Sequence, residues 1–511
     1  MCRDGLRGQG RHPLQSLRGG GITIFTKDNL LRLLMLALLA FVTMGYHPGL
    51  EDDHVYLAAI QSDLNSHLYP HDAAFFRVQL QATVFDQFMA GFVRVTRVPV
   101  AYAELLWQFL AILVILGACW DIAQFLFEDA WVPWAGVAFV GAMLTLPVSG
   151  SALTLADQHL HPRNLATALI LLAVCALLRR RGWLTAFLLI MAFAMHPVMA
   201  AFGVSFCLFL LLSEWMGSRS WIRAGSTGLN AAAPLGWIFE APTVQWRRAL
   251  ETRRYLFLYR WTWYEWLGAL APLALFVWLW RWALRRGNEK LSRFALAVAC
   301  YGAFQQAVAM FMLGIPRFIR LTPLQPMRYL HLVYYAMVLV AGCLLGQFLL
   351  RRSLPRWVAF LALAFGGMFA GQRALYPASP HLELPWLQSS NPWVQAFLWI
   401  RQNTPVDAYF ALDPGYMRAP GEEYHSFRAL AERSQLADAI KDAAVVTQVP
   451  ELGKEWARES DALVGWKNFK HADFEHLHQE FGVNWVLKSY PGSAGLRCMW
   501  HNSQLEVCQI D

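Results

Sequence analysis

Charged side chains are scarce in this chain. Of its 511 residues, 15% are Asp, Glu, Lys or Arg, and 57% are hydrophobic. An ordinary soluble domain has roughly 25% charged and roughly 45–50% apolar residues. The composition therefore excludes an ordinary soluble protein. Apolar stretches long enough to cross about 30 Å of hydrocarbon recur between residues 28 and 375, and they predict a polytopic α-helical membrane protein.

The chain also lacks the short motifs of several enzyme classes. It has no Walker loop, no G-x-G-x-x-G, no G-x-S-x-G and no H-E-x-x-H. The net charge of +8 does not predict a nucleic-acid partner, because the basic residues cluster in short loops beside apolar runs. In such loops they suit anionic headgroups, so we expect membrane lipids around them.

Ten apolar stretches predict membrane helices. The first lacks an A-x-A-like cleavage site and is predicted to remain as an anchor. Residues 1–27 before it are basic and rich in glycine, which predicts a disordered cytoplasmic tail. The ten stretches lie near residues 28–46, 101–126, 130–149, 164–178, 183–198, 199–216, 263–284, 291–314, 327–350 and 355–373.

A weakly apolar stretch near residues 223–240 decides the topology. If it crosses, the chain has about 11 transmembrane helices, and the region after residue 375 faces the same side as the first loop; if not, that region is cytoplasmic. The positive-inside rule does not decide, because each model places ten Lys and Arg residues inside and eight outside between residues 217 and 356. We favour the crossing, because it gathers two Arg-rich loops and a possible disulfide on the external side.

Residues 376–511 form a domain of different character. Helix-then-strand patterns recur in this region and predict a small soluble α/β domain, which we expect to be external or periplasmic. The last two strands can place Cys498 and Cys508 opposite each other. A disulfide there is an open alternative to two free thiols, and it requires an oxidising compartment. No C-x-x-C pair occurs, and five other cysteines lie in or beside apolar runs.

The densest acidic cluster follows the first apolar stretch. In "GLEDDHVYLAAIQ", Glu51, Asp52 and Asp53 stand side by side. Helix capping is one explanation, but a cap needs one acid. Three acids repel one another unless a cation, a metal or a hydrogen-bonding substrate lies among them. The sequence that follows predicts two interfacial amphipathic helices, at about 54–66 and 72–97.

Three basic segments are predicted on the same side as these acids. Arginine and histidine in such segments can grip a lipid-linked phosphate or pyrophosphate. The alternatives are a solvated loop for the first segment and, if it faces the cytoplasm, an ordinary basic interfacial helix for the second. The candidate residues are His159, His161 and Arg163 in "DQHLHPRN", Arg253 and Arg254 in "LETRRYLF", and Arg317, Arg320 and Arg328 in "IPRFIRLTPLQPMR".

This layout resembles the GT-C superfamily of integral-membrane glycosyltransferases. Their first external loop carries paired acids, and "HPGLEDD" is similar to the short His-Pro-Asp-Glu signature of some members, with Glu51 and Asp52 as the matching acids. The intervening Gly-Leu departs from that signature. The Trp-Trp-Asp-x-Gly signature of oligosaccharyltransferases is absent, which disfavours that branch.

The resemblance implies an activity and a place in the cell. It implies a multi-pass enzyme of the cell (inner or plasma) membrane with a cytoplasmic N-terminus, which moves a sugar from a polyprenyl-phosphate-linked donor to an external acceptor. An acid acts as general base on the acceptor hydroxyl, and some members use a divalent cation, Mg²⁺ or Mn²⁺. Of the three acids we expect Asp52 to be the base, supported by Glu51 or Asp53.

Two other classes stay open at this point. A transporter or flippase of a lipid-linked or anionic substrate usually carries ionisable residues in mid-membrane. Here the main polar residues within the predicted spans are Gln305 and Gln306, which disfavours ion coupling. The third class is a non-catalytic membrane scaffold. The sequence does not identify a protein partner.

Overall fold

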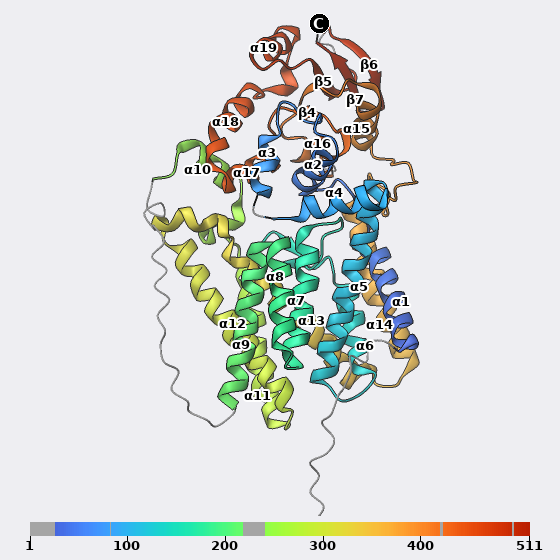
Figure 1. Cartoon of the computed structure of the whole chain (residues 1–511), viewed down its shortest axis with the longest axis vertical. Coiled ribbons are helices and arrows are strands. Elements are labelled where there is room, and N and C mark those ends of the chain that lie inside the picture. The colour runs from blue at the N-terminus through green and yellow to red at the C-terminus, as the bar shows by residue number, and fades with distance from the viewer. Residues whose placement is uncertain (1–25, 82, 218–240, 419–422, 493–494, 511) are drawn as a thin grey trace, which may run out of the picture.

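The protein has a helical bundle at one end and a smaller α/β domain at the other (Figure 1). The computed structural model describes residues 26–81, 83–217, 241–418, 423–492 and 495–510. Residues 1–25 of the predicted N-terminal tail lie outside the described residues. So does the weakly apolar stretch near residues 223–240, which decides the topology.

Ten helices of the bundle lie where the sequence predicts membrane helices. Six segments are long and apolar enough to cross a membrane, namely α5, α9, α11, α12, α13 with its flanking turns, and α14, while α6, α7 and α8 are shorter apolar helices. The described residues therefore do not establish 11 spans. The bounds are α1 (Lys27–Met44), α5 (Val100–Leu126), α6 (Val132–Ala142), α7 (Pro162–Leu178), α8 (Gly182–Met195), α9 (Pro197–Gly217), α11 (Trp263–Arg285), α12 (Glu289–Gly314), α13 (Leu330–Leu345) followed by η7 (Gly346–Leu350), and α14 (Leu354–Leu375).

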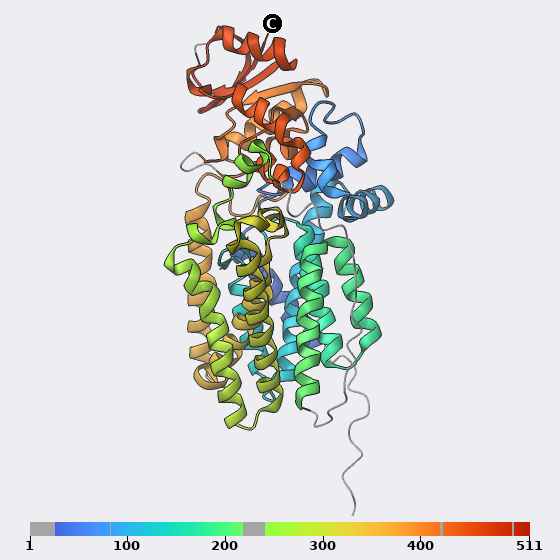
Figure 2. The ribbon, with the colours of Figure 1, turned by 90° about the vertical axis from the view of Figure 1, so that its left-hand side faces the viewer.

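All the predicted functional loops meet at one end of the bundle. Helix α9 runs away from the small domain, whereas α10 (Val244–Glu251) lies beside that domain (Figures 1 and 2). The Arg253 guanidinium donates to the carbonyl of Ile440 in the small domain. The first loop, the Arg-rich segment that contains Arg253 and the C-terminal domain therefore lie on the same side of the bundle.

The first loop differs from its prediction. The predicted interfacial helix at 54–66 is α2 (Asp53–Leu64), but ten of its 12 residues are buried. Protein covers it, because α16 (Phe427–Ala431) of the C-terminal domain and α4 (Phe85–Thr96) pack against it. The single helix predicted at 72–97 is two, α3 (Ala74–Leu80) and α4. The chain turns between them, and the Val84 N–H donates to the carbonyl of Ala194 over 3.0 Å.

The C-terminal domain is built on a mixed five-stranded sheet. Strand order is β4-β3-β5-β7-β6, with β3 parallel to β4 and β5, and β7 antiparallel to β5 and β6. Helix α15 begins at the Asn391 cap predicted from the sequence and packs on one face, while α19 packs on the other. Cys498 and Cys508 form a disulfide between the last two strands. The strands are β3 (Tyr409–Leu412), β4 (Ser434–Gln435), β5 (Trp485–Ser489), β6 (Arg497–His501) and β7 (Leu505–Gln509), and the helices are α15 (Pro392–Asn403), α17 (Lys441–Gln448), α18 (Gly453–Ala462) and α19 (His471–Phe481).

Buried ion pairs join the C-terminal domain to the first loop. The Arg428 guanidinium donates to Asp72 Oδ2 over 2.7 Å and to Asp442 Oδ1 over 3.0 Å. His54 Nε2 of α2 lies 2.9 Å from the same oxygen of Asp442. Unpaired charges in such a buried place are costly, so these partners fix how the domain sits over the loop.

Candidate active site

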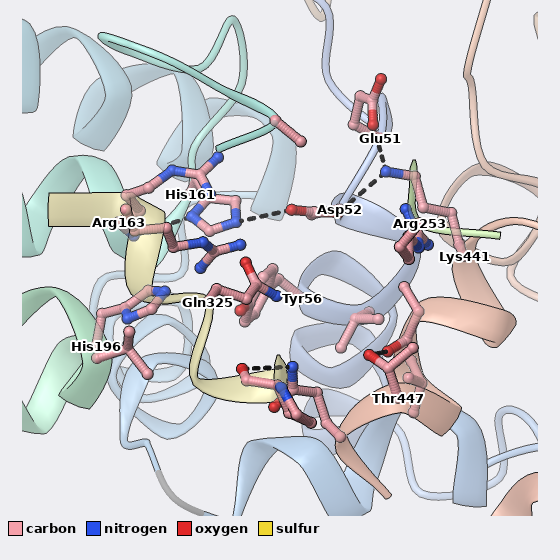
Figure 3. A pocket seen from close by; sticks show the side chains of 18 of the residues that line it. Glu51, Asp52, Tyr56, His161, Arg163, His196, Arg253, Gln325, Lys441 and Thr447 are labelled. Carbon is pink, nitrogen blue, oxygen red and sulfur yellow. Dashed lines mark hydrogen bonds and ion pairs between the residues drawn. The ribbon is translucent and has the colours of Figure 1, made fainter. Parts of the chain in front are cut away.

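A cavity of about 270 Å³ lies between the end of the bundle and the C-terminal domain. Residues far apart in the sequence contribute its walls, from the first loop to α17 of the C-terminal domain. Figure 3 shows the side chains that point into it. Its polar lining comprises Glu51, Asp52, Tyr56, Thr83, His161, Arg163, His196, Arg253, Tyr255, Gln325, Arg328, Lys441, Thr447 and Gln448.

Asp52 is the acid best placed to react in this cavity. It is the residue before α2, but its side chain makes no capping hydrogen bond and is 40% exposed. Its Oδ1 lies 3.0 Å from Lys441 Nζ and its Oδ2 lies 3.3 Å from His161 Nε2 (Figure 3). Burial works to raise the pKa of Asp52, but Lys441, His161 and Arg163 outweigh it and hold that pKa well below its ordinary value. Asp52 is therefore ionised at neutral pH.

Glu51 shares the cation that contacts Asp52. Lys441 Nζ also donates to Glu51 Oε2, so one ammonium bridges two carboxylates. Glu51 has a left-handed backbone with φ of 53°, and the Glu51 N–H donates to the carbonyl of Tyr424 over 2.9 Å. Its side chain is 40% exposed and lines the cavity. Glu51 and Asp52 thus form an acidic pair.

Asp53 faces the opposite way. It is 1% exposed, and its Oδ2 accepts the Gly49 N–H over 2.7 Å, which closes the turn before α2. Burial, followed by the nearby Glu104 carboxyl, raises the pKa of Asp53 well above its ordinary value. Successive helical residues point about 100° apart, so Asp52 and Asp53 cannot face the same cavity. Asp53 thus holds the turn before α2 rather than capping the helix.

His161 links Asp52 to the rest of its own basic segment, "DQHLHPRN". Its Nδ1 accepts the Arg163 N–H over 2.9 Å and caps α7. A neutral imidazole that accepts at Nδ1 carries its proton on Nε2, which is the atom that faces Asp52. Burial lowers the pKa of His161, which favours this neutral form. Arg163 in turn donates from Nε to Asp157 Oδ2 over 3.1 Å.

Arg253 and Arg328 carry unused hydrogen-bond donors. Both line the cavity, and the Nε atom of each is buried without a hydrogen-bond partner among the described residues. Buried donors are rarely left unpaired in folded proteins, and an ordered water or an ion often explains them. Guanidinium groups match phosphate oxygens in geometry and charge. These two groups can therefore receive an anion.

The remaining predicted residues lie outside the cavity lining. His159 is buried behind it, with Nε2 4.0 Å from Asp53 Oδ1, and burial lowers its pKa to about 3. Arg254 is exposed and donates to the carbonyl of Arg260. Arg320 packs over the Trp246 ring and donates to the carbonyl of Ala241. Arg317 is exposed at the surface. The structure thus separates them from Arg163, Arg253 and Arg328.

Sequence reasoning missed Lys441 and underrated His196. Lys441 begins α17, and 389 positions separate it from Asp52 in the chain. No local pattern marks it, apart from being one basic residue in "DAIKDAAV". His196 lies in the hairpin between α8 and α9, where one His beside a Pro is more often structural, but it lines the cavity. Burial lowers its pKa, so it presents a neutral ring there.

Three groups of described residues could hold a metal ion. They are His47, Glu383 and His425; Cys498, Glu506 and Cys508; and His54, Asp438 and Asp442. None of the three lines the cavity. The second contains the disulfide, and the third is paired with Arg428. The described part of the chain therefore places its metal-binding groups away from the acidic pair.

Comparisons with known proteins give a distant structural match. No protein-family model and no curated protein sequence matches the chain. Among solved structures, the chain is similar to the archaeal oligosaccharyltransferase AglB from Archaeoglobus fulgidus in complex with an inhibitory peptide and a dolichol-phosphate, with a TM-score of 0.40 and 12% identity over 91% of this chain and 70% of that chain. It is also similar to an apo form of an oligosaccharyltransferase from the same organism, with a TM-score of 0.34 and 11% identity over the same shares.

Proposed function

We propose that this protein is a membrane glycosyltransferase that moves a sugar from a polyprenyl-phosphate-linked donor to an acceptor hydroxyl. The main support for this proposal is that one cavity is lined by both a carboxylate and guanidinium groups. Asp52 stands on one wall as an ionised carboxylate, and Arg253 and Arg328 line other walls, each with a buried guanidinium Nε that has no hydrogen-bond partner among the described residues. Transfer from a lipid phosphate needs both groups, a base for the acceptor and cations for the leaving phosphate.

In this reaction the acidic and the basic residues of the cavity have different roles. Asp52 takes the proton of the acceptor hydroxyl while the acceptor oxygen bonds to the anomeric carbon of the sugar. The bond from that carbon to the phosphate oxygen breaks, and its electron pair leaves on the lipid phosphate. Arg253 and Arg328 stabilise this negative charge. The His161 Nε2–H, 3.3 Å from Asp52 Oδ2, orients the base.

The surface beside the cavity suits the lipid part of the donor. Tyr255 lines the cavity, and the chain continues to Tyr259, Trp263 and Tyr264, which are exposed at the start of α11. Aromatic residues with a polar atom favour the membrane interface. We propose that the polyprenyl chain lies along this surface while its phosphate enters the cavity.

We place the cavity and the C-terminal domain on the external side of the cell membrane, with the N-terminus cytoplasmic. The disulfide between Cys498 and Cys508 supports this orientation, because disulfides persist in oxidising compartments. The domain and the cavity share Lys441, so they must face the same compartment.

Two features of the bundle disfavour the transporter. Gln305 donates to Ser205 Oγ over 2.8 Å, and Gln306 Oε1 accepts from Tyr329 Oη over 2.7 Å, so each has a partner inside the protein. The charged cavity lies at the end of the bundle beside the C-terminal domain.

The experiment that tests the function uses purified protein in proteoliposomes with radiolabelled polyprenyl-phosphate sugars and a panel of hydroxyl acceptors. A glycosyltransferase releases polyprenyl phosphate and labels the acceptor. A flippase instead moves the intact donor to the other leaflet, and a scaffold does neither. Either of the last two results would overturn the proposal.

A further inference from the structure

One ammonium occupies the space between the two acids of the cavity. Lys441 Nζ donates to Glu51 Oε2 and to Asp52 Oδ1, the latter over 3.0 Å. The Lys441 side chain is 5% exposed, so the charge is held in place rather than free in solvent. The positive charge of the ammonium is attracted to both carboxylates and offsets the repulsion between them.

The C-terminal domain supplies this cation through one helix face. Five residues of α17 line the cavity, Thr447 and the set Lys441, Ala444, Val445 and Gln448. The spacing of this set of four, i, i+3, i+4 and i+7, is that of one side of a helix. Helix α17 also contacts α10 and α3, so its position relative to the first loop is fixed from two sides.

A divalent cation does not fit the same place. Mg²⁺ and Mn²⁺ need free carboxylate or other oxygen ligands, and the facing oxygens of Glu51 and Asp52 already accept from Lys441. The next oxygens, those of Asp157, accept from Nε and Nη2 of Arg163. His161 uses its Nδ1 lone pair for the Arg163 N–H, so its Nε2 faces Asp52 as a donor. The oxygens between the two acids, and those of Asp157, are thus already engaged by Lys441 and Arg163.

We propose that the Lys441 ammonium takes the place of a divalent cation at the Glu51–Asp52 pair, so that transfer by this protein is independent of metal. The inference rests on the proposed glycosyltransferase activity for its catalytic part. Its metal-binding part does not depend on that activity. It says that Glu51 and Asp52 bind a metal ion only when the Lys441 ammonium is removed. Lys441 is a positioning residue, which acts by neutralising Glu51 and orienting Asp52.

The first experiment measures metal binding without any substrate. Purified full-length protein is titrated with Mn²⁺ and followed by electron paramagnetic resonance. Wild type should show no Mn²⁺ site that depends on Asp52. Lys441→Ala should gain one site, and the double variant Lys441→Ala/Asp52→Asn should lose it. An Asp52-dependent Mn²⁺ site in wild type, or no gain in Lys441→Ala, would overturn the inference whether or not the protein transfers sugar.

The second experiment measures transfer. EDTA should leave the wild-type rate unchanged. Lys441→Met should lower kcat/KM about 100-fold, the scale expected when one partner of a buried charge pair is removed, and Lys441→Arg should recover most of it because it keeps the charge. Mn²⁺ should stimulate Lys441→Ala and not wild type. Loss of the wild-type rate in EDTA, with recovery on adding Mn²⁺, would contradict the proposal.

A matched control exists in the same domain. Lys488 Nζ lies 3.0 Å from Glu506 Oε1, with both side chains less than 10% exposed, and this pair is absent from the cavity lining. Lys488→Met removes a comparable buried ion pair. It should leave transfer and Mn²⁺ binding unchanged. An equal loss of transfer in Lys441→Met and Lys488→Met would assign Lys441 a structural role only and refute the inference.

Discussion

His161 Nε2 lies 3.3 Å from Asp52 Oδ2. The contact is directional, because the Nδ1 atom of the same ring accepts the Arg163 N–H and thereby leaves the proton on Nε2. One imidazole therefore caps a membrane helix and orients the proposed base. The two roles use different nitrogen atoms, so a substitution can separate them.

His161→Asn is the variant that separates them. The Asn carbonyl can accept the Arg163 N–H, as other Asn caps do, but the shorter side chain cannot reach Asp52. We expect sugar transfer to fall about 10- to 100-fold, the worth of a hydrogen bond to a charged group, while thermal stability in detergent stays near that of wild type. Unchanged transfer would remove His161 from the mechanism.

Asp53→Asn should change stability rather than activity. Because the pKa of Asp53 is raised in the folded protein, the folded state holds this proton more tightly than the unfolded state. The carboxyl therefore destabilises the fold increasingly as pH rises from its unfolded pKa through its folded pKa. Asn removes this penalty and still accepts the Gly49 N–H. The gain in melting temperature over wild type should be larger at pH 8 than at pH 5; an equal gain at both values would contradict the raised pKa.

Arg428→Met should release the C-terminal domain from the first loop. Arg428 pairs with Asp72 and Asp442 in a fully buried place, and burial is outweighed by these partners, which raise its pKa. Removing it leaves two buried carboxylates, at a cost of about 3–5 kcal/mol in unfolding free energy. Denaturant titration in detergent measures this loss.

The control for Arg428 is an exposed arginine of the same domain. Arg458 Nε lies 3.8 Å from Glu480 Oε1 at the surface. Arg458→Met should change the unfolding free energy by less than about 0.5 kcal/mol. Similar losses in both variants would show that Arg428 has no special place in docking the domain.

The orientation in the membrane is open to a direct test. Topology reporters fused after residues 240 and 375 should both report the external side, and a reporter after Arg286 should report the cytoplasm. Alkylation without reduction should leave Cys498 and Cys508 unmodified, because they are joined in a disulfide. A cytoplasmic signal at residue 375, or free thiols at both positions, would place the cavity on the wrong side for an external acceptor.

The sequence predicted the helices of the bundle well, because local hydropathy is enough to locate a membrane helix. The ten helices lie within a few residues of their predicted stretches, except α6, which ends at Ala142 rather than near residue 149. There the chain leaves the helix for the short strands β1 (Pro147–Val148) and β2 (Leu153–Thr154). Helix α2 lies close to its predicted bounds, but its burial was not predicted, because part of it comes from α16, which lies more than 350 positions away in the chain.

The site was predicted only in part, for two physical reasons. Neighbouring residues on a helix point in different directions, so choosing between Asp52 and Asp53 requires the first residue of α2 to be known without error. The cation between Glu51 and Asp52 comes from a residue 390 positions away from Glu51, which no local pattern reveals. The sequence predicted that a cation, a metal or a hydrogen-bonding substrate lies among the three acids, and in the structure the Lys441 ammonium lies between two of them, Glu51 and Asp52.

The most direct test of the account compares Asp52→Asn with Asp53→Asn in the release of polyprenyl phosphate from a labelled donor. Both variants replace one carboxylate by its isosteric amide at adjacent positions, so they differ mainly in which side of α2 they alter. Asp52→Asn should lower kcat about 100- to 10,000-fold, the worth of a general base, and Asp53→Asn should retain the wild-type rate. Full activity of Asp52→Asn would contradict the account.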